Sequence, residues 1–269
     1  MLKLFRYYLF ILVITGSFVS GCATVPLTHR NQVSLVSNKE LIQSSFQSYN
    51  ELIGKSSISK SRRDNIVLER VSKRLTKAVE ELMKEYNRSD ELSYFDWEYN
   101  LIEDDDVVNA FCMPGGKIVV YTGILPIAET ETGLAVVIGH EIAHAIAHHG
   151  NERLSQMILA DLGAKTLAAA VSKNSVRTRN LFLLAFGVGS QLGVILPYSR
   201  LHEYEADRLG LTIMAKAGYD PREAVEFWKR MQAQQDQKMV EFLSTHPSSE
   251  KRIENMRTYL PEAMKYYKN

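Results

Sequence analysis

The sequence predicts an α+β fold that is mostly helical, with a small antiparallel sheet next to one buried helix. Three observations carry this prediction. Apolar residues recur at helical spacing over residues 64–86, short segments of β-forming residues lie between residues 94 and 121, and an apolar segment over residues 131–149 contains two histidines four positions apart. A chain of 269 residues, 45% hydrophobic and 23% charged, suits a globular protein with a sizeable core.

The N-terminus has the pattern of a targeting segment that is removed from the mature protein. Lys3 and Arg6 precede an apolar run over residues 7–19, which is too short to span a bilayer comfortably. A Val-Ser-Gly-Cys sequence that ends at Cys22 resembles a bacterial lipobox, which implies cleavage before this cysteine and membrane attachment through its lipids. Ala23 then resembles an outer-membrane address, facing the periplasm, in a host with two membranes. A plain secretory signal or an uncleaved anchor is the alternative.

We therefore divide the chain into a signal peptide at residues 1–21, a lipid-anchored tether at residues 22–60 and one folded domain over residues 61–269. The tether is polar and without a strong period, so it is expected to be a linker or a loosely docked helix. The formal net charge is +1, and no basic stretch is interleaved with aromatic residues, which argues against nucleic acid as a partner. Cys112 is left without an intramolecular disulfide partner and is expected to be a small buried side chain, with a regulatory thiol as the alternative.

The elements before the central helix follow in order. Residues 64–86 predict a long amphipathic helix with a charged outer face. Alternating aromatic and apolar residues predict strands at residues 94–100, 107–113 and 117–121. Between the last two strands, a Pro-Gly-Gly turn at residues 114–116 offers glycines that can take a positive φ. An edge strand here could hold an extended peptide by main-chain hydrogen bonds, whereas a hairpin that only packs on the helix is the alternative.

The central helix contains the sequence His140-Glu141-x-x-His144. On an α-helix, residues i and i+4 lie about 40° apart around the axis and about 6 Å apart along it, so two imidazoles there can share one tetrahedral zinc ion. Glu141 can then take the proton of a water bound to the zinc. An ordinary amphipathic helix with buried histidines is the alternative interpretation.

The ends of this helix are also marked in the sequence. Thr130 and Glu131 are the expected N-cap and acidic first turn, and Gly150 is the expected stop. His148 and His149 are interpreted as residues at the helix end, near the negative pole of its dipole, with a supporting role behind the zinc ligands as the less favoured alternative.

After the central helix, residues 151–172 predict a further helix. Residues 181–196 are very apolar but interrupted by glycines, which favours a buried helix or a cleft-lining element over a segment inserted in the membrane. Residues 199–217 predict a helix that carries Glu203 and Asp207 on one face. Glu203 is therefore the expected third zinc ligand, and Asp207 is expected to orient a ligand histidine from behind; a solvated acidic helix start is the alternative.

At this point the chain resembles the M48 metallopeptidases, the Ste24/HtpX/OMA1 group of gluzincins, and in particular their lipoprotein branch. The resemblance rests on four separated motifs in the order of the family: Asn109-Ala110-Phe111 with Pro114-Gly115-Gly116, His140-Glu141-x-x-His144, Glu203-x-x-Ala206-Asp207, and His246-Pro247 followed by Arg252. It implies a mostly helical, zincin-like peptidase domain with a small sheet, and endoproteolysis of polypeptides.

His246 lies in a loop that is followed by a basic helix. It could donate a hydrogen bond to a developing oxyanion or occupy the fourth position of the zinc in a closed resting state, and a structural turn histidine is the alternative. Arg252 could anchor this loop or the carboxylate pair.

The sequence therefore predicts a lipid-anchored zinc endopeptidase of the bacterial envelope with one Zn²⁺ per chain. Its ligands would be His140, His144 and Glu203, Glu141 its base, His246 an oxyanion donor and extended polypeptides its substrates. By the resemblance, damaged or misassembled envelope proteins are the expected substrates. The alternative is an envelope assembly factor or chaperone that binds unfolded chains and seldom cuts them. A structural zinc site is disfavoured, because such sites prefer cysteine ligands.

Overall fold

The structure is a computed structural model that describes residues 22–162, 199–233, 240–247 and 249–268. The predicted signal peptide at residues 1–21 and the apolar segment at residues 181–196 lie outside the described residues. Among the residues that the structure describes, none of the helices combines the length and the apolar character needed to cross a membrane.

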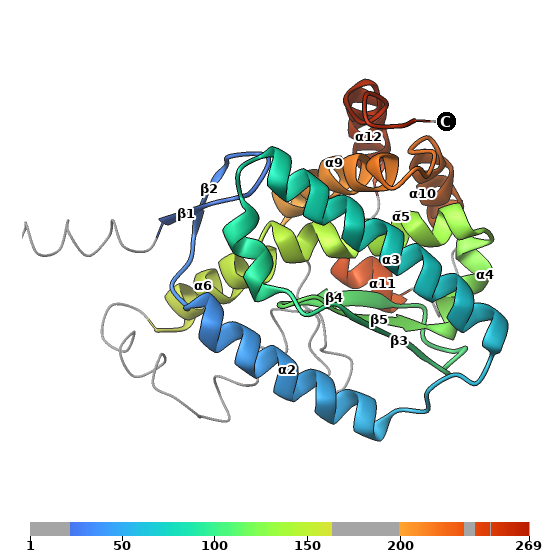
Figure 1. The fold of residues 1–269 in the computed structure, drawn as a ribbon, viewed down its shortest axis with the longest axis horizontal. Coiled ribbons are helices and arrows are strands. Elements are labelled where there is room, and N and C mark those ends of the chain that lie inside the picture. Colours follow the sequence, from blue (N-terminus) through green and yellow to red (C-terminus); the bar gives the residue numbers. More distant parts are fainter. Residues whose placement is uncertain (1–21, 163–198, 234–239, 248, 269) are drawn as a thin grey trace, which may run out of the picture.

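The described part of the chain is mostly helical with small sheets, which confirms the predicted fold class (Figure 1). Its helices are α2 (Asn38–Lys55), α3 (Arg62–Glu85), α4 (Leu125–Ala128), α5 (Glu131–Ile146), α6 (His149–Leu162), α9 (Arg200–Lys216), α10 (Glu223–Ala233), α11 (Val240–Thr245) and α12 (Glu250–Ala263). Its strands are β1 (Cys22–Thr24), β2 (Asn31–Val33), β3 (Glu98–Ile102), β4 (Ala110–Met113) and β5 (Lys117–Tyr121). Short 3₁₀ segments cover Ser89–Tyr94 and Thr122–Ile124.

The sheet of β3, β4 and β5 is mixed, so the prediction of a purely antiparallel sheet was wrong in this detail. β4 and β5 form the expected antiparallel hairpin, in which Gly115 and Gly116 have φ angles of 82° and 86°. β3 instead pairs in parallel with β5, with Glu98 opposite Lys117. The alternation of side chains along a strand specifies which face is buried, but it does not specify which neighbour the strand pairs with.

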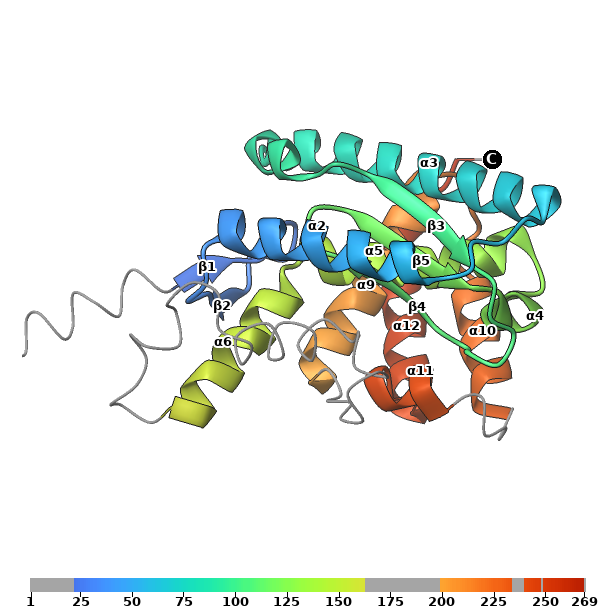
Figure 2. The ribbon, with the colours of Figure 1, turned by 90° about the horizontal axis from the view of Figure 1, so that it is seen from below.

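The two faces of this sheet are covered by different helices (Figures 1 and 2). Successive side chains on a strand point to opposite faces, so alternate residues enter different apolar clusters. The cluster shared with α3 and α5 takes Ala110, Cys112, Ile118 and Val120. The cluster on the other face, between the sheet and α2, takes Phe111, Met113 and Val119. The sheet therefore lies between α2 and the helix that carries the His-Glu-x-x-His sequence.

Part of the region predicted as a tether is a helix packed on the sheet. In α2, Tyr49 is 1% exposed and accepts a 2.7 Å hydrogen bond from Asn100 on β3. Ser45 donates a 2.7 Å hydrogen bond to the carbonyl oxygen of Pro114 in the hairpin turn. Of the two alternatives for this region, residues 38–55 form the docked helix. The boundary at residue 60 between tether and domain stays a prediction.

The central helix α5 begins as predicted and ends earlier than predicted. The side chain of Thr130 caps its first turn by accepting a 3.0 Å hydrogen bond from the backbone N–H of Gly133. At the other end, His148 takes a left-handed φ of 56°, so the chain turns there and α6 starts at His149. Gly150 therefore lies in the first turn of α6 and does not end α5. This turn brings His149 back against α5.

Helix α9 crosses α5 at close range. A Cβ atom at Gly210 would lie 3.2 Å from the backbone nitrogen of His140 and 3.3 Å from its Cα, so the absence of a side chain permits this approach. Helix α12 packs on α9 in turn (Figure 1). The side chains of α9 that face α5 can therefore reach its two histidines.

Candidate metal centre

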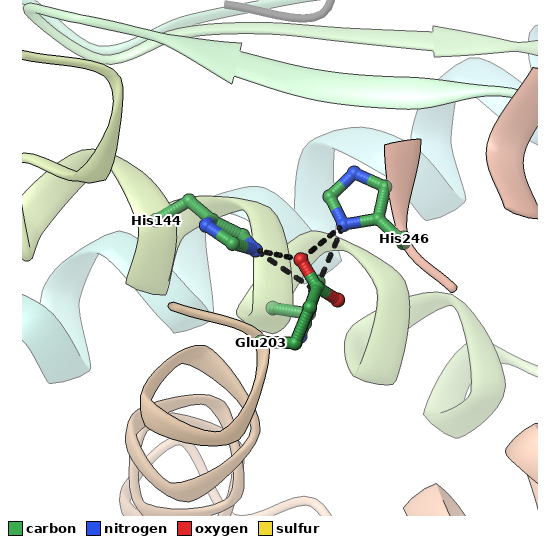
Figure 3. A group of neighbouring side chains, drawn as sticks. His144, Glu203 and His246 are labelled. Carbon is green, nitrogen blue, oxygen red and sulfur yellow. Dashed lines mark hydrogen bonds and ion pairs between the residues drawn. The ribbon is translucent and has the colours of Figure 1, made fainter. Parts of the chain in front are cut away.

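Four buried side chains from three separate segments converge at one point. His140 and His144 come from α5, Glu203 from α9, and His246 from the loop after α11, and one ligand atom of each lies within 4.8 Å of the others. Figure 3 shows the carboxylate of Glu203 between the rings of His144 and His246. The structure thus brings together the predicted zinc ligands and adds His246 to them.

The spacing of these atoms fits a tetrahedral zinc ion. Four nitrogen and oxygen ligands at about 2.0–2.1 Å from zinc are separated from one another by about 3.3 Å. The ligand atoms of the structure lie 3.1–3.4 Å apart. Nε2 of His140 is 3.1 Å from Nε2 of His144, 3.2 Å from Nδ1 of His246 and 3.4 Å from Oε2 of Glu203. Oε1 of Glu203 is 3.2 Å from Nδ1 of His246 and 3.3 Å from Nε2 of His144. A donor set of imidazoles and one carboxylate is also one that zinc prefers.

His140 and Glu203 are supported from behind by Asp207 and Arg252. Oδ1 of Asp207 lies 3.0 Å from Nδ1 of His140, in the supporting position predicted for it. Arg252, which is 2% exposed, donates to both oxygens of Asp207 at 2.6 and 2.7 Å and lies 2.8 Å from Oε2 of Glu203. Its Nη1 also donates to the carbonyl oxygen of His246 at 3.4 Å. Arg252 therefore anchors both the carboxylate pair and the loop, the two roles considered for it.

The carboxyl group of Glu141 lies beside the cluster and is free to act on a water. Glu141 is 3% exposed. Among the described residues its Oε1 has no hydrogen-bond partner, and this atom lies 3.5 Å from Nε2 of His246. Burial raises the pKa of Glu141. A buried carboxylate with a raised pKa next to a metal centre has the affinity for a proton that a general base needs.

The electrostatics of two of the ligands, Glu203 and His144, suit a bound cation. Burial alone would raise the pKa of Glu203, but Arg252 and the neighbouring histidines outweigh it and hold this pKa well below its ordinary value. Burial lowers the pKa of His144 far below its ordinary value. Glu203 is therefore ionised and His144 neutral, which are the forms that bind a metal ion.

Aromatic side chains that the sequence did not single out form one wall of the centre. The ring of Phe242 stacks on His246 with centroids 4.9 Å apart, and Trp228 meets the ring of His140 at 5.8 Å. The guanidinium of Arg252 lies 3.7 Å from the centroid of Trp228. In sequence, Trp228 of α10 and Phe242 of α11 are indistinguishable from ordinary core residues, so only their contacts with residues distant in sequence reveal this role.

The remaining candidates lie near the cluster but outside it. His148 lies 3.1 Å from a carboxylate oxygen of Glu91, at the turn after α5, in agreement with its interpretation as a helix-end residue. His149 instead points inward and lies against His144. Cys112 is 7% exposed and burial raises its pKa, which fits the small buried side chain rather than a reactive thiol.

Comparisons with known proteins agree with this geometry. The sequence profile of peptidase family M48 matches residues 69–260. The chain is 36% identical to the mitochondrial metalloendopeptidase OMA1 of Schizosaccharomyces pombe over 244 residues, which cover 89% of this chain and 66% of that protein. It is 34% identical to human metalloendopeptidase OMA1 over 181 residues, covering 65% of this chain and 34% of that protein. It is 28% identical to the beta-barrel assembly-enhancing protease of Yersinia pestis over 162 residues, covering 57% of this chain and 32% of that protein.

The chain thus spans at most 66% of the length of these three relatives. The family match, in contrast, covers most of the chain. It includes all four converging residues and begins at residue 69. The chain belongs to peptidase family M48, whose metallopeptidases use zinc.

Proposed function

We propose that this protein is a zinc-dependent endopeptidase that cuts polypeptides bound in extended form. The observation that carries this proposal is the buried carboxyl of Glu141, which lies beside a set of ligand atoms with the spacing of a zinc site. A structural zinc site has no use for such a carboxyl group, whereas a hydrolytic site needs a base next to the metal.

The residues of the chain divide the work of hydrolysis. When bound by His140, His144 and Glu203, zinc supplies Lewis-acid polarisation of a peptide carbonyl and acidification of a water. Glu141 accepts the proton of the attacking water and returns it to the leaving amine. His246, once it moves away from the ligand set, is placed to donate a hydrogen bond to the oxyanion.

Strand β4 is the proposed support for the substrate. It forms one edge of the three-stranded sheet and packs beside α5, so a peptide added along it would lie next to the ligand histidines. Main-chain hydrogen bonds to an edge strand hold a peptide extended without selecting its side chains, which suits an endopeptidase with many substrates.

We place this activity in the bacterial cell envelope, with the protein attached through lipids on Cys22 and facing the periplasm. The lipobox-like sequence that ends at Cys22 supports this location. Misfolded or misassembled envelope proteins are the proposed substrates, and the similarity to the beta-barrel assembly-enhancing protease of Yersinia pestis supports this role. The rival function is an assembly factor that holds unfolded chains along the same edge strand with little cleavage.

The variant Glu141→Gln tests the enzymatic proposal. It should keep one zinc per chain, because Glu141 is not a ligand. Its rate of casein cleavage should fall by about 10²- to 10⁴-fold, the usual contribution of a general base. Glu131→Gln, at the start of the same helix and paired with Arg70, is the matched control and should cleave like the wild type. Chelator should abolish cleavage by the wild type.

Two results would contradict the proposal. Purified wild-type protein that is free of zinc, or casein cleavage by Glu141→Gln at the wild-type rate, would exclude the mechanism. If Glu141→Gln complemented a deletion strain as well as the wild type, the assembly function would be favoured.

Cell fractionation of wild type and Cys22→Ala tests the anchor, because the variant should leave the membrane fraction.

A further inference from the structure

A second group of buried polar side chains lies directly behind the zinc ligand His144. His149, the first residue of α6, is 0% exposed, and its Nδ1 lies 2.9 Å from Nδ1 of His144. Its other ring nitrogen, Nε2, lies 3.0 Å from Oε2 of Glu205 on α9. These three side chains form a continuous series of contacts from the metal centre to a carboxylate.

One arrangement of protons satisfies these contacts when His144 offers its Nε2 to a metal. The proton of the neutral His144 ring is then on Nδ1, which donates to Nδ1 of His149. Because Nδ1 of His149 must accept, the proton of this ring is on Nε2 and donates to Glu205. Each ring is thus held in one tautomer and one orientation by the group behind it.

The carboxylate of Glu205 is in turn held by the N-terminal part of the chain. Arg30, in the loop between β1 and β2, donates from Nε to Oε2 of Glu205 at 2.7 Å, and Thr28 donates to Oε1. The other end of the Arg30 guanidinium donates to both oxygens of Glu152 on α6, at 2.7 and 3.1 Å. The hairpin of β1 and β2 lies beside α6 (Figure 1). One guanidinium group therefore ties α6 to α9.

The two ligand histidines of α5 differ in their support. His140 has the carboxylate of Asp207 next to its Nδ1, the usual arrangement behind a zinc ligand. Behind His144, Nδ1 faces the ring of His149, and that ring in turn contacts the carboxylate of Glu205. The support of His144 therefore depends on a residue outside the ligand motif and on contacts with the loop at residues 25–30.

We propose that His149 is a positioning residue for the zinc ligand His144, and that Arg30 holds it in place through Glu205, so that the N-terminal hairpin strengthens zinc binding. This inference rests on the proposed zinc site. It assigns a function to the hairpin, which lies outside the residues matched by the family.

Three variants of His149 separate its two contacts. His149→Asn places an oxygen near the position of Nδ1 and can still accept from His144, whereas His149→Gln places its amide near Nε2 and can still donate to Glu205. His149→Phe keeps the ring volume and removes both contacts. Loss of a supporting partner typically costs about 10- to 100-fold in zinc affinity, which is the expected effect of His149→Phe and His149→Gln. His149→Asn should bind zinc more tightly than His149→Gln.

Zinc affinity is measured on the full-length mature protein by competition with a fluorescent chelator. The visible absorption bands of the cobalt-substituted protein are a second measurement, because they report the geometry around the metal. These bands should shift in His149→Phe and be restored towards the wild type in His149→Asn. Unchanged affinity and unchanged bands in all three variants would overturn the inference, as would tighter zinc binding by His149→Gln than by His149→Asn.

The contribution of the hairpin is tested with Arg30→Gln. Arg230→Gln is the matched control, because Arg230 also pairs with two carboxylates, those of Glu129 and Glu223, and its side chain is 23% exposed against 20% for Arg30. Arg30→Gln should bind zinc more weakly than the wild type, and Arg230→Gln should bind it equally. Equal affinity of the two variants would overturn the role of the hairpin.

Failure of this inference is distinguishable from failure of the proposed function. A wild-type protein that binds no zinc would remove the enzymatic proposal and this inference together. A wild-type protein that binds one zinc and loses cleavage in Glu141→Gln, combined with normal zinc affinity in every His149 variant, would overturn this inference alone.

Discussion

Nδ1 of His140 lies 3.0 Å from Oδ1 of Asp207, the carboxylate that Arg252 holds by both of its oxygens. Because Nε2 of His140 faces the other ligand atoms, Nδ1 is the ring nitrogen that lies next to this carboxylate. The orientation of a ligand ring on α5 is therefore fixed by an ion pair between α9 and α12. Helices α9 and α12 thus both help to fix the geometry of the metal centre.

Asp207→Asn is expected to weaken zinc binding by about 10- to 100-fold, because it removes the charge beside His140 and one of the two buried carboxylates that pair with Arg252. Competition with a fluorescent chelator measures this change. Asp220→Asn is the control, since Asp220 pairs with Arg222 at the surface. Zinc affinity that is the same in both variants would show that the carboxylate does not support the site.

His246→Ala should keep one zinc per chain and bind it more weakly, because three of the four ligand atoms remain. Water then takes the fourth position. The visible absorption bands of the cobalt-substituted protein should shift in this variant relative to the wild type, because an oxygen ligand replaces one of the nitrogen ligands. Identical spectra for the two proteins would mean that His246 is not a ligand in solution.

Gly210→Ala should lower zinc affinity because its Cβ would lie 3.2 Å from the backbone of His140 and push α9 away from α5. Such overpacking costs about 1–3 kcal/mol, whereas the better helix propensity of alanine returns at most about 1 kcal/mol. Gly54→Ala is the control, because no atom lies within 4 Å of the added Cβ in α2. It should be neutral or stabilising in urea unfolding and normal in zinc affinity. A Gly210→Ala protein with normal zinc affinity would contradict close packing as the requirement.

The ion pair of Glu152 should make stability depend on acidity. Burial alone would raise the pKa of Glu152, but His202 and Arg30 outweigh it and lower this pKa from 4.5 to about 2. The stabilisation is therefore complete above pH 4.5 and is lost as the pH falls through about 2. Glu152 is 6% exposed and the side chain of Arg30 is 20% exposed, so solvent screens the pair in part and the stabilisation is on the order of 1–3 kcal/mol.

In Glu152→Gln the free energy of unfolding should be lower at neutral pH and fall less steeply between pH 4.5 and 2. Urea unfolding in the presence of chelator measures both effects without a contribution from metal release. The surface variant Glu254→Gln should follow the wild type. Parallel profiles for wild type and Glu152→Gln would exclude this ion pair as the cause.

Local patterns in the sequence predicted the helices at the centre of the site. The periodicity over residues 64–86 became α3, and the segment at residues 199–217 became α9 with Glu203 and Asp207 facing α5. Such predictions succeed because helical spacing alone decides which side chains share a face. The start of α5 was predicted for a similar reason, because an N-cap threonine acts within a single turn.

Other features depend on contacts between distant residues and could not be read from local patterns. The parallel pairing of β3 with β5 and the docking of α2 result from packing on two faces of the sheet. His149 was interpreted as a helix-end residue because a helix was expected to continue to Gly150. The left-handed turn at His148 redirects the chain, and the side chain of His149 is fully buried against α5, where the less favoured alternative of a supporting role applies.

The burial of the metal centre has a kinetic consequence. His140, Glu141, His144 and His246 are each 3% exposed, and His246 closes the position where a water would attack. We expect a polypeptide to reach Glu141 only after His246 moves away from the ligand set. Movement of His246 is therefore expected to contribute to the turnover rate, because opening of a closed site sets kcat in many enzymes. A substrate that keeps His246 displaced would raise the activity of the enzyme that cuts it, and without such a substrate proteolysis would stay low.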